Sequence, residues 1–546
     1  MDTNRELKTG RSIETRRKQG EFFTPTIWVD KAHEYISNTF GEDWKEKYVV
    51  WDPAWGTGNL TRDYKFKELY CSTLNQSDID TANQMGYNNE GVKFQFDFLN
   101  DPDEKLPQAL RDVIASGREI IVLMNPPYIK ATPNKGNDST GVSNTIIGRE
   151  MGFKKMGIAS SQLSTQFLFK ITKLQKKCNN IRIAVFNKPN FMTSDGFKIL
   201  RNYFMCNYGF VKGFLFNASH FSDTADSWGV SFSIWDIIPN VDKNNFKHNV
   251  LDIDNDYNIT KMYDKILYNC DGLEKANKIF SKKEKNNIIL PPIKSFITID
   301  NKKEKLGNTE AIGYINNDSN NVMQQQVVFL ASSVISANGN KSITKDRLYN
   351  IVNLFTARKS VRQNWINDKD EYLAPNENHE QYGQFTYDSI VYSLFNNSSQ
   401  QSSLRQITYK NKLWDIKNEF FWISKEEMLD LSNTNHYTEL YSDARTSDER
   451  YVYKLLFGEE LIYDRLSPDA KLVLDKATEL TKKSIKARQM MADNHNHLNS
   501  WDAGYAQLKL VWKEYFPEEF KEFRQLYKNL EDRIRPLVYE LGFLMK

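Results

Sequence analysis

An apolar run that stops at two prolines constrains the fold of this chain more than any other feature. Ile120–Met124 is uninterrupted by polar residues, as in a strand buried on both faces of a parallel sheet. Asn125-Pro126-Pro127 follows, and because the prolines fix φ and remove two backbone donors, the strand cannot continue. Open α/β sheets bind ligands at the carboxyl ends of their strands. We therefore expect a ligand site here, with the amide of Asn125 and the ring of Tyr128 as its first candidate groups.

Three earlier segments, predicted as strands, precede this one at the spacing of βα units, and the third of them alternates between apolar and polar residues. Each is followed by an acidic residue, which predicts a parallel, doubly wound α/β sheet with polar groups gathered along one edge. The three pairs of predicted strand and acid are residues 48–51 with Asp52, residues 69–74 with Asp78, and residues 92–96 with Asp97.

The loop after Asp52 carries two glycines, Gly56 and Gly58, and we expect a helix to begin near Leu60. Glycines let a ligand approach the backbone closely. The loop lacks the third glycine of a dinucleotide fingerprint and the Gly-Lys-Ser/Thr of a phosphate-binding loop. An acid beside such a loop suits a cationic or amino-bearing ligand better than a pyrophosphate.

Taken in order, these motifs resemble those of S-adenosylmethionine-dependent DNA adenine-N6 methyltransferases of the gamma arrangement. Phe23-Thr24-Pro25 comes first, then the glycine loop, then Asn125-Pro126-Pro127-Tyr128, with the region expected to recognise the target last. The matching motifs cover roughly residues 15–240. The resemblance implies a Rossmann-like methyltransferase sheet, S-adenosyl-L-methionine as cofactor, and methylation of an adenine flipped out of double-stranded DNA.

The resemblance also implies a role for each matching residue. Asn125, Pro126 and Tyr128 correspond to the catalytic site, where two oxygen acceptors hold the adenine amino group and the ring stacks on the base. No metal is required. The residues that correspond to the cofactor site are Phe23, Thr24, Pro25, Asp52, Ala54, Gly56, Gly58, Asp78, Asp97 and Phe98.

Several assignments stay open. Asp80 lies close enough to Asp78 to be exchanged with it. Trp55 stands where the family usually has a small residue or cysteine, so it either narrows the cofactor site or packs under the loop. Pro127 is one expected residue of the pocket for the target base. A second aromatic residue for this pocket is expected from the closing hairpin of the sheet, residues 211–216 and 230–237. The candidates are Phe232 and Trp235, and each is also a plausible core residue.

The composition changes beyond residue 240, where Asn, Lys and Asp become frequent. We expect an α+β target-recognition region, with strands at residues 348–356 and 390–395, and then a helical tail with a helix that begins at Ser467-Pro468. The predicted division is a basic N-terminal arm (1–19), a catalytic domain (20–240), a linker or start of the recognition region (241–289), the recognition domain (290–446) and a helical C-terminal segment (447–546).

Two polar clusters in the recognition region are predicted to contact DNA, because Arg, Asn and Gln suit base edges and Lys suits phosphates. The alternative for each cluster is an ordinary polar surface loop. The residues proposed for DNA contact are Arg358, Lys359 and Arg362 in the first cluster, and Arg405 and Lys410 in the second.

Composition excludes other classes of protein. No apolar run approaches the about 18 residues that a membrane span requires. The four cysteines lie far apart without a CxxC pair, so neither a zinc site nor a disulfide framework is indicated. We expect a soluble cytoplasmic protein without membrane contact.

Three alternatives to a stand-alone DNA methyltransferase remain. The chain could be the methylating part of a restriction–modification system that needs a cognate endonuclease or specificity subunit. It could instead methylate glutamine in proteins, since Asn-Pro-Pro-Tyr also serves amide nitrogens. The third alternative is a DNA-binding protein that has lost catalysis, against which the intact Asn125 to Tyr128 turn argues.

Overall fold

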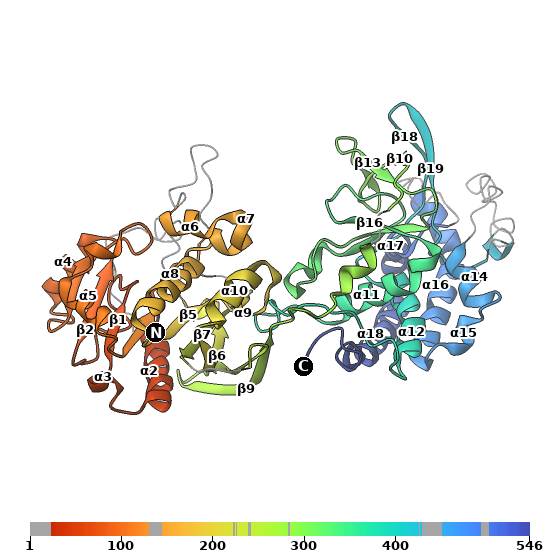
Figure 1. Ribbon diagram of the computed structural model, residues 1–546. Helices are drawn as coiled ribbons and strands as arrows, with labels where there is room; N and C mark the ends of the chain where they lie inside the picture. Colours follow the sequence, from red (N-terminus) through yellow and green to blue (C-terminus); the bar gives the residue numbers. More distant parts are fainter. Residues whose placement is uncertain are drawn as a thin grey trace. The chain divides into compact units, whose positions relative to one another are not determined.

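The computed structural model describes residues 23–129, 145–221, 224, 226–237, 242–281, 284–424, 426–428, 450–492 and 502–546. The chain divides into two compact units (Figure 1). The first comprises Met1–Gly272, Asn364–Asp370 and Lys546, and the second comprises Leu273–Gln363 and Glu371–Met545. The basic arm predicted for residues 1–19 lies outside the described residues.

A nine-stranded sheet in the order β3-β2-β1-β4-β5-β7-β6-β8-β9 forms the core of the first unit. Neighbours among β1 to β5 pair in parallel, and β7 is antiparallel to both β5 and β6. This is the doubly wound, Rossmann-like sheet that the sequence predicts. The strands are β1 (Val49–Asp52), β2 (Leu69–Thr73), β3 (Val92–Gln95), β4 (Ile120–Met124), β5 (Ile181–Asn187), β6 (Gly209–Asn217), β7 (Gly229–Asp236), β8 (Asn245–Ile253) and β9 (Ile259–Tyr268).

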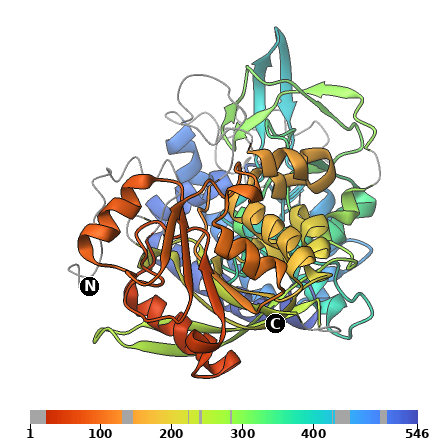
Figure 2. The ribbon, with the colours of Figure 1, turned by 60° about the vertical axis from the view of Figure 1, so that its left-hand side comes forward.

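Helices cover both faces of this sheet (Figures 1 and 2). Adjacent β1 residues show the two layers, because Val50 and Trp51 belong to separate apolar clusters. One cluster includes residues of α2 (Thr26–Phe40), α3 (Trp44–Lys47) and α4 (Gln76–Met85), and the other includes residues of α5 (Gln108–Ala115), α8 (Leu163–Cys178) and α10 (Lys198–Met205). The remaining short elements are η1 (Asp103–Lys105), α6 (Ile146–Met151), α7 (Phe153–Met156), η2 (Gly157–Ser161), α9 (Asn190–Thr193), η3 (Asp195–Phe197) and η4 (Ala218–His220).

Two segments of the first unit differ from the sequence prediction. The helix expected near Leu60 is absent, and tight turns take its place: the N–H groups of Thr61 and Arg62 both donate to the carbonyl of Gly58, at 2.9 and 2.8 Å. The segment 241–289, predicted as a linker or the start of the recognition region, contains β8 and β9, which extend the sheet. Buried Phe246, His248 and Val250 alternate along β8, which is the period of a strand with one covered face.

The second unit combines small sheets with a helical core. Its four-stranded sheet has the order β16-β14-β15-β17, and three two-stranded ribbons pair β10 with β13, β11 with β12, and β18 with β19. The strands are β10 (Ile288–Leu290), β11 (Ile293–Ser295), β12 (Thr298–Ile299), β13 (Lys305–Gly307), β14 (Gly313–Asn316), β15 (Phe329–Ala331), β16 (Asn340–Ile343), β17 (Ser399–Gln400), β18 (Leu404–Tyr409) and β19 (Lys412–Ile416).

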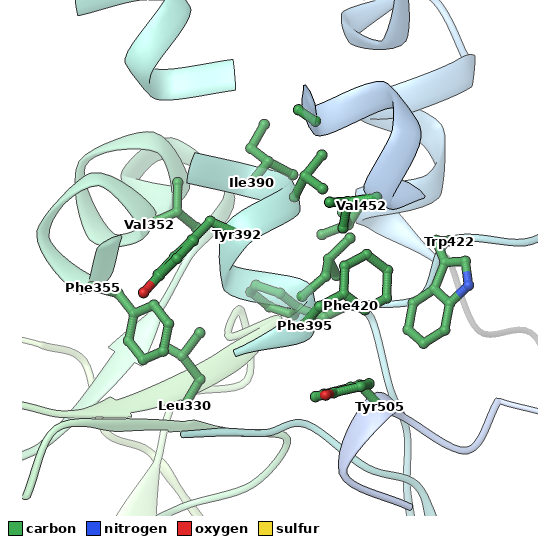
Figure 3. Close-up of a cluster of buried hydrophobic side chains, with 14 of the residues drawn as sticks. Leu330, Val352, Phe355, Ile390, Tyr392, Phe395, Phe420, Trp422, Val452 and Tyr505 are labelled. Atoms are coloured by element: carbon green, nitrogen blue, oxygen red, sulfur yellow. The ribbon is translucent and has the colours of Figure 1, made fainter. Parts of the chain in front are cut away.

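The helices of the second unit pack around one large apolar cluster, in which Phe355, Phe395 and Trp422 are buried (Figure 3). The predicted helix start at Ser467-Pro468 is confirmed, since α16 begins at Pro468 and Ser467 Oγ accepts from the N–H of Ala470 at 3.3 Å. The helical elements are η5 (Ala276–Phe280), η6 (Val322–Val327), η7 (Lys345–Arg347), α11 (Leu348–Ser360), α12 (Tyr382–Phe395), α14 (Tyr451–Phe457), α15 (Ile462–Arg465), α16 (Pro468–Ala492), α17 (Tyr505–Tyr515) and α18 (Pro517–Glu540).

The strands predicted at residues 348–356 and 390–395 are wrong, because both segments are helical and lie in α11 and α12. The last six residues of α12 are all buried, as are ten of the thirteen residues of α11. A helix buried on nearly every side shows no apolar stripe, so its sequence cannot be told from that of a buried strand by periodicity.

Candidate active site

Sequence motifs that lie far apart in the chain meet at the carboxyl edge of the sheet. β1 pairs with β2 on one side and with β4 on the other. Asp52 ends β1, and Asn125 follows the last residue of β4. The strand order reverses between β1 and β4, which is where doubly wound sheets bind their ligands.

Asp52 carries a buried carboxyl group of which one oxygen accepts a hydrogen bond and the other, among the described residues, does not. Its side chain is 0% exposed, and Oδ1 accepts from the N–H of Ala54 at 3.0 Å. Oδ2 has no hydrogen-bond partner within the part of the chain that the structure describes. Burial raises the pKa of Asp52 to about 8, against the opposing effect of the Ala54 bond. A cationic group at this edge would both pair the orphaned oxygen and favour the ionised carboxylate.

The glycine loop is held in place by Trp55. Gly56 and Gly58 have φ values of 52° and 77°, and a Cβ on Gly58 would lie 2.9 Å from the indole of Trp55. The indole is only 3% exposed, and its Nε1 donates to Thr61 Oγ1 at 3.0 Å. Of the two roles left open for this residue, the structure supports packing under the loop.

A chain of hydrogen bonds orients the amide of Asn125. Its Nδ2 donates to Thr24 Oγ1 at 2.9 Å, and its Oδ1 accepts from the hydroxyl of Tyr128 at 2.5 Å. Thr24 is buried just before α2, and its carbonyl also accepts from Nδ2 of Asn59 in the glycine loop at 3.4 Å. The first, second and third motifs of the sequence therefore meet in one network, with the oxygen of the Asn125 amide on the side of Tyr128.

The orienting role of Thr24 can be tested by substitution. Thr24→Val keeps the shape but removes the acceptor for Asn125 Nδ2, and we expect kcat of the reaction at this site to fall about tenfold, as for the loss of one hydrogen bond. KM for the substrate should stay unchanged, and Thr24→Ser should restore kcat. Steady-state kinetics of both variants checks this, and a fully active valine variant would contradict it.

Three aromatic rings, from Tyr128, Phe221 and Trp228, form a cluster that we call the aromatic wall. The ring of Tyr128 meets those of Phe221 and Trp228 edge to face, with centroids 6.4 and 6.0 Å apart. Lys188, just after β5, places Nζ 3.4 Å from the carbonyl oxygen of Tyr128 and 4.5 Å from the ring centroid of Trp228. Trp228 is half-buried, so one part of its surface stays accessible, whereas Phe221 is buried.

Phe232 and Trp235, the predicted partners of the target base, are both core residues. Each is 0% exposed on β7, with Phe232 packed against Phe186 and Trp235 against Phe204 in the two opposite apolar clusters. Neither ring can reach a ligand in this structure. Trp228 precedes β7, and because β7 runs antiparallel to β5, this residue lies at the carboxyl edge of the parallel strands. The sequence carries no signal for it, since the residue stands outside the strand.

The residues predicted for the ribose and adenine of the cofactor lie after β2 and β3. Asp78 is buried in the first turn of α4 and accepts from Thr73 Oγ1 at 2.8 Å, while Asp80 is exposed. Asn75, which the sequence prediction missed, stands closer to the end of β2. Asp97 accepts from the N–H groups of residues 99 and 100, both at 3.1 Å, and closes the turn in which the buried Phe98 lies.

The structure removes three of the five proposed DNA contacts. Arg358 is 0% exposed, and its guanidinium donates to Asn317 Oδ1 at 2.8 Å. Lys359 donates to the carbonyl of Gln325 at 2.7 Å, and burial lowers its pKa to about 8. Arg405 is committed to an ion pair with the buried Asp502 at 3.1 Å. The two that remain exposed are Arg362 and Lys410.

Among the described residues, no group of three or more His, Cys, Asp or Glu side chains is arranged to hold a metal ion. Within the same part of the chain, no helix is both long and apolar enough to cross a membrane.

No family model and no curated protein sequence matches this chain. Several solved structures do. A DrdV–DNA complex is 17% identical, with a TM-score of 0.32 over 43% of this chain and 28% of that one. A type I restriction-modification methyltransferase subunit from Streptococcus thermophilus is 16% identical, with a TM-score of 0.32 over 44% and 50%. The Type ISP restriction-modification enzyme LlaGI, a nuclease-deletion mutant with a DNA substrate mimic, is 12% identical, with a TM-score of 0.31 over 42% and 27%. This chain thus spans half or less of each of these three chains.

Proposed function

We propose that this protein transfers a methyl group from S-adenosyl-L-methionine to the N6 amino group of adenine in double-stranded DNA. The observation that carries the proposal is the network at the carboxyl edge, where Thr24 and Tyr128 orient the amide of Asn125. An orphaned carboxyl oxygen, that of Asp52, belongs to the strand next to β4. This reaction requires a group that binds the cationic cofactor, here Asp52, and a group that accepts hydrogen bonds from the adenine amine, here Asn125.

The residues present fit the cofactor. Its methionine part carries an ammonium group that matches the unpaired, buried Oδ2 of Asp52. In the loop that follows Asp52, Gly56 and Gly58 have positive φ values and no side chains, so a ligand can approach the backbone there. Asn75 or Asp78 would hold the ribose hydroxyls, and the remaining assigned residues, Phe23, Thr24, Pro25, Ala54, Asp97 and Phe98, would border the methionine and adenine parts.

S-adenosyl-L-methionine supplies an electrophilic methyl group on a sulfonium. The residues of this chain act on the other reactant, the adenine amino group, whose lone pair is conjugated with the ring. Asn125 Oδ1 and the carbonyl of Pro126 would accept hydrogen bonds from its two protons, which favours a tetrahedral nitrogen with an available lone pair. Because an amide oxygen has two lone pairs, Oδ1 can serve the amine while Tyr128 still donates to it.

The adenine must leave the duplex to reach Asn125. The aromatic wall stands beside that amide, and Trp228 is its one half-buried ring, so we assign Trp228 to the wall of the base site together with Pro127 and Tyr128. Stacking on a base contributes roughly 1–3 kcal/mol.

The assignment of Trp228 predicts a defect in substrate binding. Trp228→Ala should raise KM for DNA by about tenfold or more, because a stacking surface is lost, whereas Trp228→Phe should stay near the wild type. Phe221→Ala serves as the comparison, since that ring is buried, and it should act on thermal stability rather than on KM. An unchanged KM for Trp228→Ala would remove this residue from the base site.

Methylation-aware sequencing tests the proposed function directly. DNA from cells that express the wild-type chain should carry N6-methyladenine in one short sequence motif, and DNA from cells with Asn125→Ala should carry none. Purified protein with labelled cofactor then shows whether the chain acts alone or needs a partner subunit or endonuclease. Label on protein glutamine with none on DNA would refute the proposal.

A further inference from the structure

The ribbon formed by β18 and β19 extends away from the helices of its unit (Figures 1 and 2). Its strands are joined by Lys410 and Asn411, whose φ values of 51° and 58° match the two left-handed positions of a type I′ turn. The twist of this turn matches that of the strands, so the turn itself favours a regular hairpin. A lone two-stranded hairpin is only marginally stable in water, and therefore its base needs an anchor.

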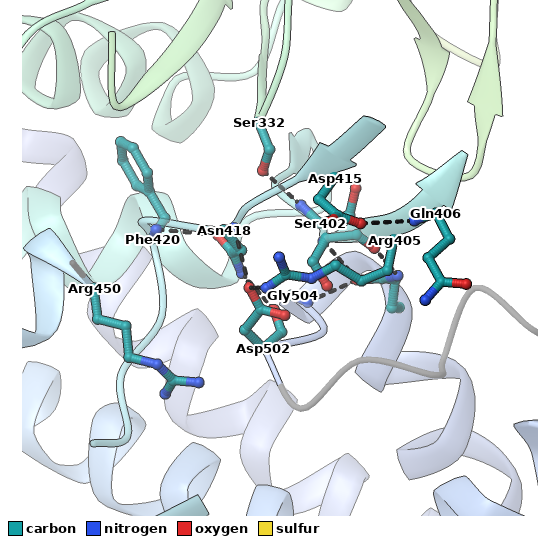
Figure 4. A network of polar contacts seen from close by, with 12 residues as sticks. Ser332, Ser402, Arg405, Gln406, Asp415, Asn418, Phe420, Arg450, Asp502 and Gly504 are labelled. Carbon is teal, nitrogen blue, oxygen red and sulfur yellow. Dashed lines mark hydrogen bonds and ion pairs between the residues drawn. The ribbon is translucent and has the colours of Figure 1, made fainter. Parts of the chain in front are cut away.

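The anchor is a buried polar network at the base of the hairpin (Figure 4). Arg405 pairs with Asp502, and the carbonyl of Asp502 accepts from Asn418 Nδ2 at 3.1 Å. The N–H of Gln406 donates to Asp415 Oδ1 at 2.7 Å and ties the two strands together. Leu404 and Ile416, which face each other across the ribbon, belong to an apolar cluster with residues of β11, β14 and β15. These polar and apolar contacts fix the base of the hairpin, so the hairpin projects from its unit as an ordered element.

The two faces of the hairpin differ. One face pairs Ile407 with Trp414, both half-buried. The other pairs Thr408 with Leu413, and Leu413 is 62% exposed although it is apolar. Exposed side chains on the second face and at the turn are Gln406, Thr408, Lys410, Asn411, Lys412, Leu413 and Asp415.

Lysines gather at the tip of the hairpin. Lys412 lies 4.1 Å from the ring centroid of Trp414. Lys410 forms an ion pair with Glu304, which brings the segment between β12 and β13 alongside the tip. Lys302 and Lys303 in that segment are exposed. The tip and this segment hold four lysines against the two acids Asp300 and Glu304, which leaves a net positive charge that suits a polyanion.

We propose that the β18–β19 hairpin enters the major groove of duplex DNA and reads part of the target sequence. The major groove is about 12 Å wide and admits a two-stranded ribbon. The exposed hydroxyl of Thr408 can donate to or accept from a base edge, and the exposed Leu413 matches the methyl group of thymine. The tip lysines lie where the flanking phosphates would pass. This inference rests on the proposed function and names the element that selects the adenine.

A charge-reversal pair tests the contact with the duplex. Lys410→Glu with Lys412→Glu is compared with Lys521→Glu with Lys528→Glu, which reverses two exposed lysines of α18. The probe is a fluorescent duplex of random sequence about 30 base pairs long. We expect the hairpin variant to lose at least about tenfold in affinity, and the slope of log K against log salt to fall by about 2. Equal losses in both variants, or no loss in the hairpin variant, would overturn the inference.

Sequence reading is tested separately by Thr408→Ala and Leu413→Ala. Each should keep the salt slope and relax the methylated motif at one position. A motif that stays as narrow as the wild-type motif in both variants overturns the reading role, even if DNA methylation itself is confirmed. If the hairpin is needed for DNA binding but the chain never methylates DNA, the proposed activity is refuted and the hairpin contact is supported. Failure of the proposed function can thus be distinguished from failure of the hairpin inference.

Discussion

Replacing Asn125 with alanine is expected to lower the rate of methyl transfer by about 10³-fold or more, while DNA binding stays close to that of the wild-type chain. The substitution removes the side-chain acceptor for the adenine amino group, and water that replaces it has no fixed orientation. It also leaves the hydroxyls of Thr24 and Tyr128 without their shared partner. Single-turnover transfer of labelled methyl groups measures the loss, and fluorescence anisotropy with duplex DNA measures the binding.

Two further variants show whether this loss is chemical or structural. Asn125→Asp keeps an acceptor oxygen at the same place and should lose less activity than Asn125→Ala. Asn180→Ala removes an amide at the opposite edge of the sheet, where Asn180 donates to the carbonyl of Gly117, and should leave the rate unchanged. If Asn125→Ala kept its activity, the amide would have no part in the reaction and the proposed mechanism would be wrong.

The strand ends of the first unit were predictable because parallel strands have a strong local signature. β4 is buried on both faces and so reads as a continuous apolar run, and the prolines after Asn125 mark its end without ambiguity. Once four strand ends are known, the doubly wound topology brings them to one edge. For this reason Asp52 and Asn125, 73 positions apart in the sequence, could be assigned to neighbouring strands.

The parts that could not be predicted depend on contacts between distant segments. Alternation along β7 shows that Phe232 and Trp235 lie on opposite faces, but not that helices cover both faces. Trp228 stands outside the strand, where no period applies. In the second unit, α11 and α12 lie inside the apolar core, and burial removes the stripe by which a surface helix is recognised.

Charged residues gave the least reliable prediction. Arg358 and Arg405 occur among polar neighbours in the sequence, as DNA-contacting residues do. In the structure both are structural: Arg358 donates to Asn317 and to the carbonyl of Asn321, and Arg405 pairs with Asp502. A buried arginine that supports a loop has the same local composition as one that reads a base. Only the partners distinguish them, and these lie 37 to 97 residues away along the chain.

Asp52→Asn is expected to weaken cofactor binding and, at the same time, to stabilise the ligand-free protein. Loss of a charge-assisted hydrogen bond to the ammonium group should lower the affinity about 10- to 100-fold. The stability gain follows from burial, which raises the pKa of Asp52 from 3.8 to about 8 in the folded state. Between these two values the unfolded chain releases a proton that the folded chain keeps, so stability falls as the pH rises. Asparagine does not titrate, so the stability of the variant does not fall with pH for this reason.

The difference in melting temperature between the variant and the wild type should therefore increase from about pH 6 to about pH 8 and level off above the folded-state pKa. Asp80→Asn, an exposed carboxylate close by, should show no such trend. Saturating cofactor should reverse the order of the two melting temperatures, because a ligand stabilises the form that binds it in proportion to the logarithm of its affinity. If the difference in melting temperature between wild type and Asp52→Asn did not change with pH, the Asp52 carboxyl would already have a partner in the folded protein. A carboxylate that is already paired could not bind the ammonium group of the cofactor, so the measurement also tests the cofactor assignment.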